Sequence, residues 1–467
     1  MRLRLAAAFV AAAGIAAGAG AAPSSAAAAA GTTASTASTA STTTLKVPRI
    51  VFKQRKLGNG LTVISSESHT SPTVSVQVWY RVGGSDDPAG RSGFAHLFEH
   101  MMFKSTKNLK SEQFDRMTED VGGSNNASTS EDVTEYDLVV PSNHLETLLW
   151  AEAERMTNLK VDLANFNSER AVVEEEYRQR ILASPYGRFF EAVRTRPYLQ
   201  HPYQRGTIGS IENLDAATLD DVVAFHDRYY RPDNATLVVT GDFDARQLDA
   251  WVDKYFARIA RPAAPLPPRE AKEPAWTGDR TVTVKAPKVP LPAVAAVWLA
   301  PPVTDADAPA LQVAAALLSS GESSRLNQAL VYRQQIATQA GFSADLRAGP
   351  GLLIASAIAA GGKTPQAVRS ALLAEVRRLV DKPASPAELD KIKVQILTGA
   401  FGTRQTPIGL ASAIGDAAVL GGDANRVNTD LDDLQRVSGA DVQRVLRRYV
   451  TGAHMVSFDY AEDATAP

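Results

Sequence analysis

The stretch Gly93-Phe-Ala-His-Leu-Phe-Glu-His-Met-Met-Phe103 decides how the rest of the chain can be interpreted. Its apolar residues would cover much of the circumference of a helix, which predicts a mostly buried helix. His96 and His100 are four residues apart and so share one helical face, with Glu99 beside them. Buried histidine and glutamate side chains need partners, because an unpaired polar group is costly to remove from water.

This His-x-x-Glu-His order supplies half of a metal site. Two imidazoles one turn apart can hold Zn²⁺ through one ring nitrogen each, and an adjacent carboxylate can take a proton from metal-bound water. The order is the inverse of the commoner zincin motif. In the alternative interpretation, His96 and His100 are ordinary helix residues near a packed surface, and the rest of the chain has to decide between the two.

Composition narrows the choice. The 467 residues are too many for one ordinary core and suggest two or three domains. The net charge of −2 and the lack of a basic arm give no electrostatic case for nucleic acid as a partner. Cysteine is absent, so any metal must be held by histidine and carboxylate, and only seven histidines are available. This restriction favours the metal interpretation.

The N-terminus carries targeting features. Arg2 and Arg4 precede a weakly apolar Ala/Gly run that ends in small residues, which predicts a signal peptide over residues 1–22. The alternative is an uncleaved membrane anchor, but an Ala/Gly-rich segment is barely apolar enough to stay in a bilayer. Residues 23–45 are nearly all Ala, Ser and Thr and predict a low-complexity linker. We therefore expect an exported protein, periplasmic or secreted, with no stable membrane anchor after signal cleavage.

Strand and helix patterns alternate along the first half without the glycine-rich phosphate turn of a nucleotide-binding unit, which predicts an α+β fold. Val74 to Tyr80 alternates in polarity, which indicates a strand with one face more strongly buried. Further strands are expected over 61–64, 134–140 and 235–239, and further helices over 111–121, 142–156 and 213–229.

The segment Asn167 to Tyr177 offers a third metal ligand. On a helix, one face would carry Glu169, Val172, Val173 and Glu176. A glutamate on the same face as two valines points inward, where a bare carboxylate is costly unless a metal or cation meets it. Glu176 is therefore the best candidate. The alternative is a solvated acidic run over 174–176, which suits the first two of these glutamates better.

The second half repeats the pattern of the first. Val294 to Trp298 occupies the place of the strand at Val74 to Trp79, and the helix that follows, Leu311 to Leu318, has no His or Glu. A duplication in which one copy lost its metal site is the simplest account, and two unrelated α+β domains are the alternative. A Pro-rich segment separates the halves. The expected bounds are 46–260 for the N-terminal domain, 261–276 for the linker and 277–467 for the C-terminal domain.

With these features the chain resembles the pitrilysin/insulinase family of inverted-motif (HxxEH) zinc peptidases, and in particular its short bacterial members related to mitochondrial processing peptidase. The similarity covers about residues 50–455, and its most specific part is the pairing of the His-x-x-Glu-His motif with Glu176, which lies 76 residues after His100. The resemblance implies two homologous α/β-roll halves, each a mainly antiparallel sheet covered by helices. The first half would be catalytic and the second non-catalytic.

The resemblance also assigns roles within the site. It implies one Zn²⁺ per chain, with His96, His100 and Glu176 as ligands. Glu99 would be the general base towards a zinc-bound water that acts as nucleophile, and Glu169 a carboxylate that supports the site. The implied activity is that of a zinc-dependent endopeptidase cleaving peptides or unfolded small proteins in an enclosed chamber.

In the family, the peptide lies in extended form against an edge strand near the metal. Here Asn126, Ala127 and Ser128 match that strand and are the expected substrate-binding residues. Ordinary turn chemistry at Asn125 and Asn126 is the alternative.

One departure from the family pattern bears on partners. Larger members hold the substrate carbonyl with an Arg and a Tyr of the non-catalytic half, and these positions fall near Leu353 and Ala360 here. We therefore expect a heterodimer with a homologous non-catalytic subunit that supplies the pair, with a homodimer as the alternative. Two other functions stay open: a non-catalytic peptide-binding or scaffold subunit of a peptidase complex, and a metal-dependent hydrolase of non-peptide substrates.

Overall fold

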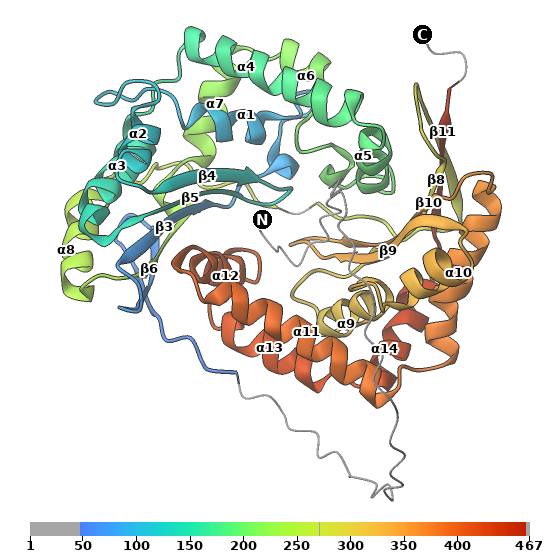
Figure 1. The fold of residues 1–467 in the computed structure, drawn as a ribbon. Helices are drawn as coiled ribbons and strands as arrows, with labels where there is room; N and C mark the ends of the chain where they lie inside the picture. Colours follow the sequence, from blue (N-terminus) through green and yellow to red (C-terminus); the bar gives the residue numbers. More distant parts are fainter. Residues whose placement is uncertain (1–46, 270, 464–467) are drawn as a thin grey trace, which may run out of the picture.

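The computed structural model describes residues 47–269 and 271–463 as two halves, each built from one sheet and its covering helices (Figure 1). The predicted signal peptide, 1–22, and low-complexity linker, 23–45, lie outside the described residues. Within the described ranges, no helix is both long enough and apolar enough to cross a membrane.

The first half contains a six-stranded sheet in the order β1-β2-β6-β3-β5-β4. All neighbouring strands are antiparallel except β2 and β6, which are parallel. The strands are β1 Lys53–Lys56, β2 Thr62–Glu67, β3 Thr73–Tyr80, β4 Ser124–Thr129, β5 Thr134–Pro141 and β6 Ala235–Gly241.

The second half contains a five-stranded sheet in the order β7-β11-β8-β10-β9. Again one pair, β7 and β11, is parallel and the rest are antiparallel. The order matches that of the first sheet without β1, so the predicted α+β fold of two mainly antiparallel halves is confirmed. The strands are β7 Arg280–Ala286, β8 Ala293–Ala300, β9 Ala337–Asp345, β10 Gly351–Ala359 and β11 Val456–Glu462.

Helices cover both sheets (Figure 1). The expected helix over 213–229 is in fact two helices, because Thr218 forms a capping box with Asp221 and starts a new one. In the first half the helices are α1 Phe94–Met101, α2 Gln113–Glu119, α3 Leu145–Asn158, α4 Leu163–Tyr177, α5 Gly187–Thr195, α6 Ile211–Asp215, α7 Leu219–Tyr229 and α8 Ala245–Tyr255. In the second half they are α9 Ala308–Ser319, α10 Pro365–Asp381, α11 Pro386–Arg404, α12 Pro407–Val419, α13 Arg426–Arg436 and α14 Gly439–Leu446.

The strand β3 is buried on both faces, so the expectation of one more strongly buried face was wrong. Helix α12 of the second half covers the face that carries the polar residues (Figure 1). There, Gln77 donates to the carbonyl of Ile408 and to the Ser412 hydroxyl, each at 3.1 Å. Trp79 packs against Gly415, where a Cβ would lie only 2.2 Å from the indole.

Helix α5 makes the reciprocal crossing. It belongs to the first half in sequence, but its Phe189 and Val193 pack in one cluster with Ala295 and Val297 of β8. Each sheet is thus covered on one face by its own helices and on the other by one helix of the opposite half. Because apolar burial on both faces depends on this exchange, the two halves are held together by core packing.

Candidate metal centre

The start of α1 is fixed from outside the helix. Gly93 is its N-cap residue and has no side chain to cap with, and its φ of 97° lies in the left-handed region. The carboxylate of Asp87 instead accepts hydrogen bonds from the backbone N–H groups of Gly93 at 2.6 Å and Ala95 at 2.9 Å. Burial raises the pKa of Asp87 to about 7, against the opposing effect of these two bonds. No pattern in the sequence pointed to Asp87 in this role.

The rest of α1 is locked by packing. Phe94, Leu97 and Phe98 are fully buried in the core of the first half. The hydroxyl of Tyr136, on β5, donates to the backbone carbonyl of Phe98 at 3.2 Å. Because the apolar faces are fixed in this way, His96 and His100 are both turned towards α4, where they meet Glu176.

Three predicted ligands converge between α1 and α4. Nε2 of His96 lies 3.5 Å from Oε2 of Glu176, and Nε2 of His100 lies 3.4 Å from the same oxygen. These three residues form the one group of metal-binding side chains found within the described residues. Ligands about 2.1 Å from a tetrahedral zinc are about 3.4 Å from one another. Both histidine-to-glutamate separations therefore fit Zn²⁺, and all three donor atoms lie within 4.8 Å of one another.

The prediction that one face of α4 points inward is confirmed only in part. Glu169 and Val173 are buried and Glu176 is half-buried, but Val172 is 46% exposed, so its predicted place on that face was wrong. Fewer side chains of α4 are buried against its neighbours than the spacing predicted. Glu175 is exposed and pairs with Arg178, as expected of a solvated acidic residue, but the Glu174 side chain is only 14% exposed, so the same expectation for Glu174 was wrong.

The two imidazoles differ in charge when no metal is bound. Burial lowers the pKa of His96 to about 4, so its imidazole is neutral at neutral pH. Burial also lowers the pKa of His100, but hydrogen bonds to Glu169 and Glu176 outweigh it and raise the pKa to about 9. Since a metal needs both rings neutral, loading this site would release a proton from His100.

Glu169 supports the second histidine. Its Oε2 lies 3.5 Å from Nδ1 of His100, and its Oε1 lies 2.7 Å from Nζ of Lys104. Burial raises the pKa of Glu169, but His100 and Lys104 overcome this and hold it below its usual value. A carboxylate behind a ligand histidine fixes the ring and its tautomer. Among the described residues, Nδ1 of His96 has no such partner.

The predicted base is held by a strand. Oε2 of Glu99 accepts a hydrogen bond of 2.6 Å from the hydroxyl of Thr129, the last residue of β4. Burial raises the pKa of Glu99, although this hydrogen bond opposes the rise. A general base is most efficient when its pKa lies near the working pH, and the raised pKa brings the Glu99 carboxylate closer to that range. The role of Thr129 was missed, because no local pattern links β4 to α1.

The predicted substrate strand lies at the sheet edge. β4 pairs only with β5 within the six-stranded sheet, and in this pairing Asn126, Ala127 and Ser128 lie opposite Asp137, Tyr136 and Glu135. Ala127 is buried and its two neighbours are partly or fully exposed. An edge strand presents unpaired N–H and C=O groups, with which another extended chain can pair.

The two positions that correspond to the family's Arg and Tyr carry no polar side chain in this chain. Leu353 lies on β10 and is fully buried in the core of the second half. Ala360 follows the end of the same strand and is half-buried. Neither position brings a polar group to the metal centre.

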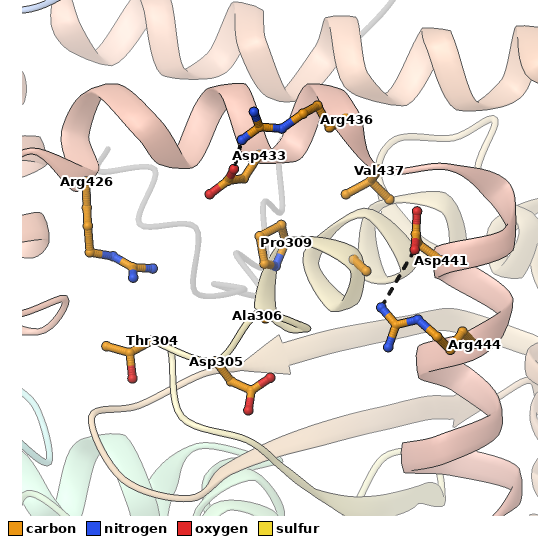
Figure 2. Close-up of a pocket in the computed structure, with 11 residues that line it drawn as sticks. Thr304, Asp305, Ala306, Pro309, Arg426, Asp433, Arg436, Val437, Asp441 and Arg444 are labelled. Carbon is orange, nitrogen blue, oxygen red and sulfur yellow. Dashed lines mark hydrogen bonds and ion pairs between the residues drawn. The ribbon is translucent and has the colours of Figure 1, made fainter.

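A separate hollow of about 310 Å³ lies in the second half, between the start of α9 and helices α13 and α14 (Figure 2). Its walls carry arginines and aspartates in equal number, and Figure 2 shows Arg436 joined to Asp433 and Arg444 joined to Asp441. The charges cancel locally, and none of the predicted site residues lines this hollow.

Comparisons with known proteins identify the family. Residues 62–209 match the family Insulinase (Peptidase family M16), and residues 216–396 match Peptidase M16 inactive domain. The chain is 35% identical over 344 residues to Zinc protease PqqE of Helicobacter pylori, covering 72% of this chain and 77% of that protein.

Solved structures share the fold. The crystal structure of a protease from Helicobacter pylori matches with a TM-score of 0.84 and 30% identity, covering 88% of this chain and all of that one. The periplasmic protease PqqL from Escherichia coli matches with a TM-score of 0.72 and 20% identity, covering 90% of this chain but only 48% of that one. The second likeness concerns the fold alone. From the family matches and the extent of the likeness to PqqE, the chain belongs to the insulinase family, peptidase family M16, and is a metalloendopeptidase.

Proposed function

We propose that this chain cleaves peptide bonds with one zinc ion held by His96, His100 and Glu176. The observation that carries the proposal is the convergence of two imidazole nitrogens on one carboxylate oxygen at 3.4 and 3.5 Å. Bound there, Zn²⁺ would polarise a water molecule and the substrate carbonyl. Glu99 is within the same helix and takes the proton from the attacking water, then returns it to the departing amine.

The chain's own residues prepare this proton transfer. The hydroxyl of Thr129 holds one oxygen of Glu99, which leaves the other oxygen for the water. Burial of Glu99 excludes competing water and raises its pKa towards the working range. Glu169 and Lys104 keep the ring of His100 in one orientation.

We propose that the substrate is an extended peptide or unfolded segment that pairs with the free edge of β4 through Asn126, Ala127 and Ser128. Backbone pairing tolerates many sequences and leaves selection to side-chain pockets. The exchange of α5 and α12 between the halves supports an enclosed chamber, because it fixes the second sheet relative to the first. The domain bounds 46–260, 261–276 and 277–467 belong to the same proposal.

A second candidate is a non-catalytic peptide-binding or scaffold subunit. The match of residues 216–396 to an inactive peptidase domain favours it for the second half. The complete donor set and the base on α1 favour catalysis for the first half.

The two candidates differ in zinc content and hydrolysis. Protein purified without chelator should carry one zinc per chain and should hydrolyse a mixture of unstructured peptides. Glu99→Gln should keep the zinc and lose at least about 100-fold in kcat, the size of a general-base contribution. Wild-type protein with zinc and no hydrolysis of any peptide would support the scaffold instead.

We also propose export to the periplasm and a dimeric active form. The Ala-rich N-terminus supports export, and PqqL, one of the related folds, is described as periplasmic. The lack of a polar group at Leu353 supports a homologous non-catalytic partner that completes substrate binding. Full peptidase activity from the purified chain as a monomer would overturn the heterodimer.

A further inference from the structure

Arg180 is an exposed cation at the edge of the metal centre. It lies in the helical turn Arg178–Ala183, which continues α4 directly after the ligand Glu176. Its Nη1 is 2.6 Å from Oε1 of Glu176, the carboxylate oxygen that does not face the histidines. Glu176 thus joins the metal donors on one side to a guanidinium on the other.

The two cations next to the site are placed differently. The Lys104 side chain is 22% exposed and is engaged by Glu169 behind His100. The Arg180 side chain is 68% exposed, and within the described part of the chain Glu176 is its one ion-pair partner. A guanidinium has five N–H donors in a planar fork, so a single contact to Glu176 leaves most of them for a ligand.

The charges near the centre favour an anionic ligand. Lys104 and Glu169 neutralise each other, and a bound Zn²⁺ would be balanced by Glu99 and Glu176. The charge of Arg180 is then left over on the exposed side. A planar guanidinium matches the geometry of a carboxylate and holds it with charge-assisted hydrogen bonds.

We propose that Arg180 determines specificity by selecting peptides that carry a carboxylate next to the scissile bond. This rests on the proposed peptidase function, since Arg180 contacts the proposed ligand Glu176 and so lies beside a substrate held at the metal. The carboxylate comes either from an Asp or Glu side chain or from the free C-terminus of a short peptide. A role limited to holding Glu176 would change zinc affinity and leave substrate preference unchanged.

The test uses quenched fluorescent peptides that differ only in having Glu, Gln or Lys at the positions flanking the cleaved bond, each with a free or an amidated C-terminus. Wild type should favour Glu over Gln about tenfold in kcat/KM, the size of one charge-assisted interaction. Arg180→Gln should abolish this preference, and Arg180→Glu should favour Lys. If wild type instead cleaves Glu and Gln peptides equally but favours the free over the amidated C-terminus, and Arg180→Gln loses that difference, the C-terminal carboxylate is the source.

Arg178→Gln is the matched control. Arg178 lies at the start of the same turn but pairs with Glu174 at 3.1 Å and Glu175 at 3.5 Å, so its loss should leave the preference intact. Binding of the same peptide sequences, labelled with the fluorophore and no quencher, to Glu99→Gln gives by fluorescence anisotropy a readout that needs no hydrolysis. Raising the salt concentration should weaken the preference in both assays.

Equal Glu-to-Gln ratios together with equal ratios of free to amidated C-terminus, in wild type and in Arg180→Gln, would overturn the inference, whatever their zinc content. Absence of hydrolysis by wild type would instead count against the proposed function. In that event the anisotropy series with Glu99→Gln and the double variant Glu99→Gln, Arg180→Gln still decides the role of Arg180.

Discussion

Glu169→Gln tests whether the carboxylate behind His100 acts on the metal site or only on local packing. Glutamine has the same size and can keep the hydrogen bond from Ser168, which is 3.1 Å long. It removes the negative charge that lies 3.5 Å from Nδ1 of His100 and 2.7 Å from the Lys104 amine. The ring then loses the group that favours one tautomer and orientation.

The size of the effect follows from these distances. Loss of a partner behind a ligand histidine costs about 10- to 100-fold in metal affinity. The 3.5 Å between Glu169 and His100 makes this a long and therefore weak hydrogen bond, so the lower end applies: about tenfold, or about 1.4 kcal/mol. The effect on folding should be under about 1 kcal/mol, because the Lys104 side chain is partly exposed and can turn to water.

Zinc affinity should be measured by competition with a chelating indicator at pH 7, with thermal unfolding of the metal-free protein as the check on folding. Glu174→Gln is the control, because Glu174 lies on the same helix but pairs with Arg178. Its zinc affinity should match that of wild type. The reasoning is refuted if Glu169→Gln binds zinc as tightly as wild type, or if both variants weaken it equally.

Three further perturbations probe the supports of the site. Gly415→Ala should lower the unfolding temperature, because its Cβ would lie 2.2 Å from Trp79 and overpacking costs about 1–3 kcal/mol. Gly402→Ala is the control: a Cβ there meets nothing within 4 Å, so this substitution should raise the unfolding temperature. Asp87→Asn should flatten the pH dependence of stability, seen in denaturant unfolding at several pH values. Because the pKa of Asp87 is raised to about 7, the native state keeps a proton that the unfolded chain has lost, and wild-type stability falls as pH rises from about 4 to 7. Thr129→Val should lower kcat about tenfold with zinc content unchanged, because Glu99 loses its hydroxyl donor; an unchanged kcat would contradict this.

The proposed metal ligands were predictable because their geometry is local. His96 and His100 are separated by one helical turn, and any helix over that range puts them on one face. Glu176 was identified by burial logic, since a carboxylate beside apolar residues needs a cation. The same logic failed for Val172, because the buried face of α4 includes fewer residues than a period of 3.6 residues implies.

The supports of the site were not predictable, because they depend on segments that meet only in three dimensions. Thr129 reaches Glu99 from 30 residues away, and the contact follows from β4 lying against α1. Gln77 is polar and alternates with valines, which indicates a solvent-facing position. It is buried because α12, more than 300 residues later, supplies its hydrogen-bond partners.

The segment that carries Glu176 also joins the metal centre to the second half. After this ligand the chain turns through Arg178–Ala183 and enters α5, which packs on the second sheet. Gly187, the first residue of α5, lies so close to this turn that a Cβ would be 2.3 Å from the carbonyl oxygen of Arg180. Close-packed contacts of this kind transmit displacement, since the neighbouring backbone cannot give way without shifting. Any movement of the second sheet relative to the first would therefore act on Arg180 and Glu176 through about one and a half helical turns of chain, and would couple the proposed enclosure of substrate to the geometry of the proposed metal ligands.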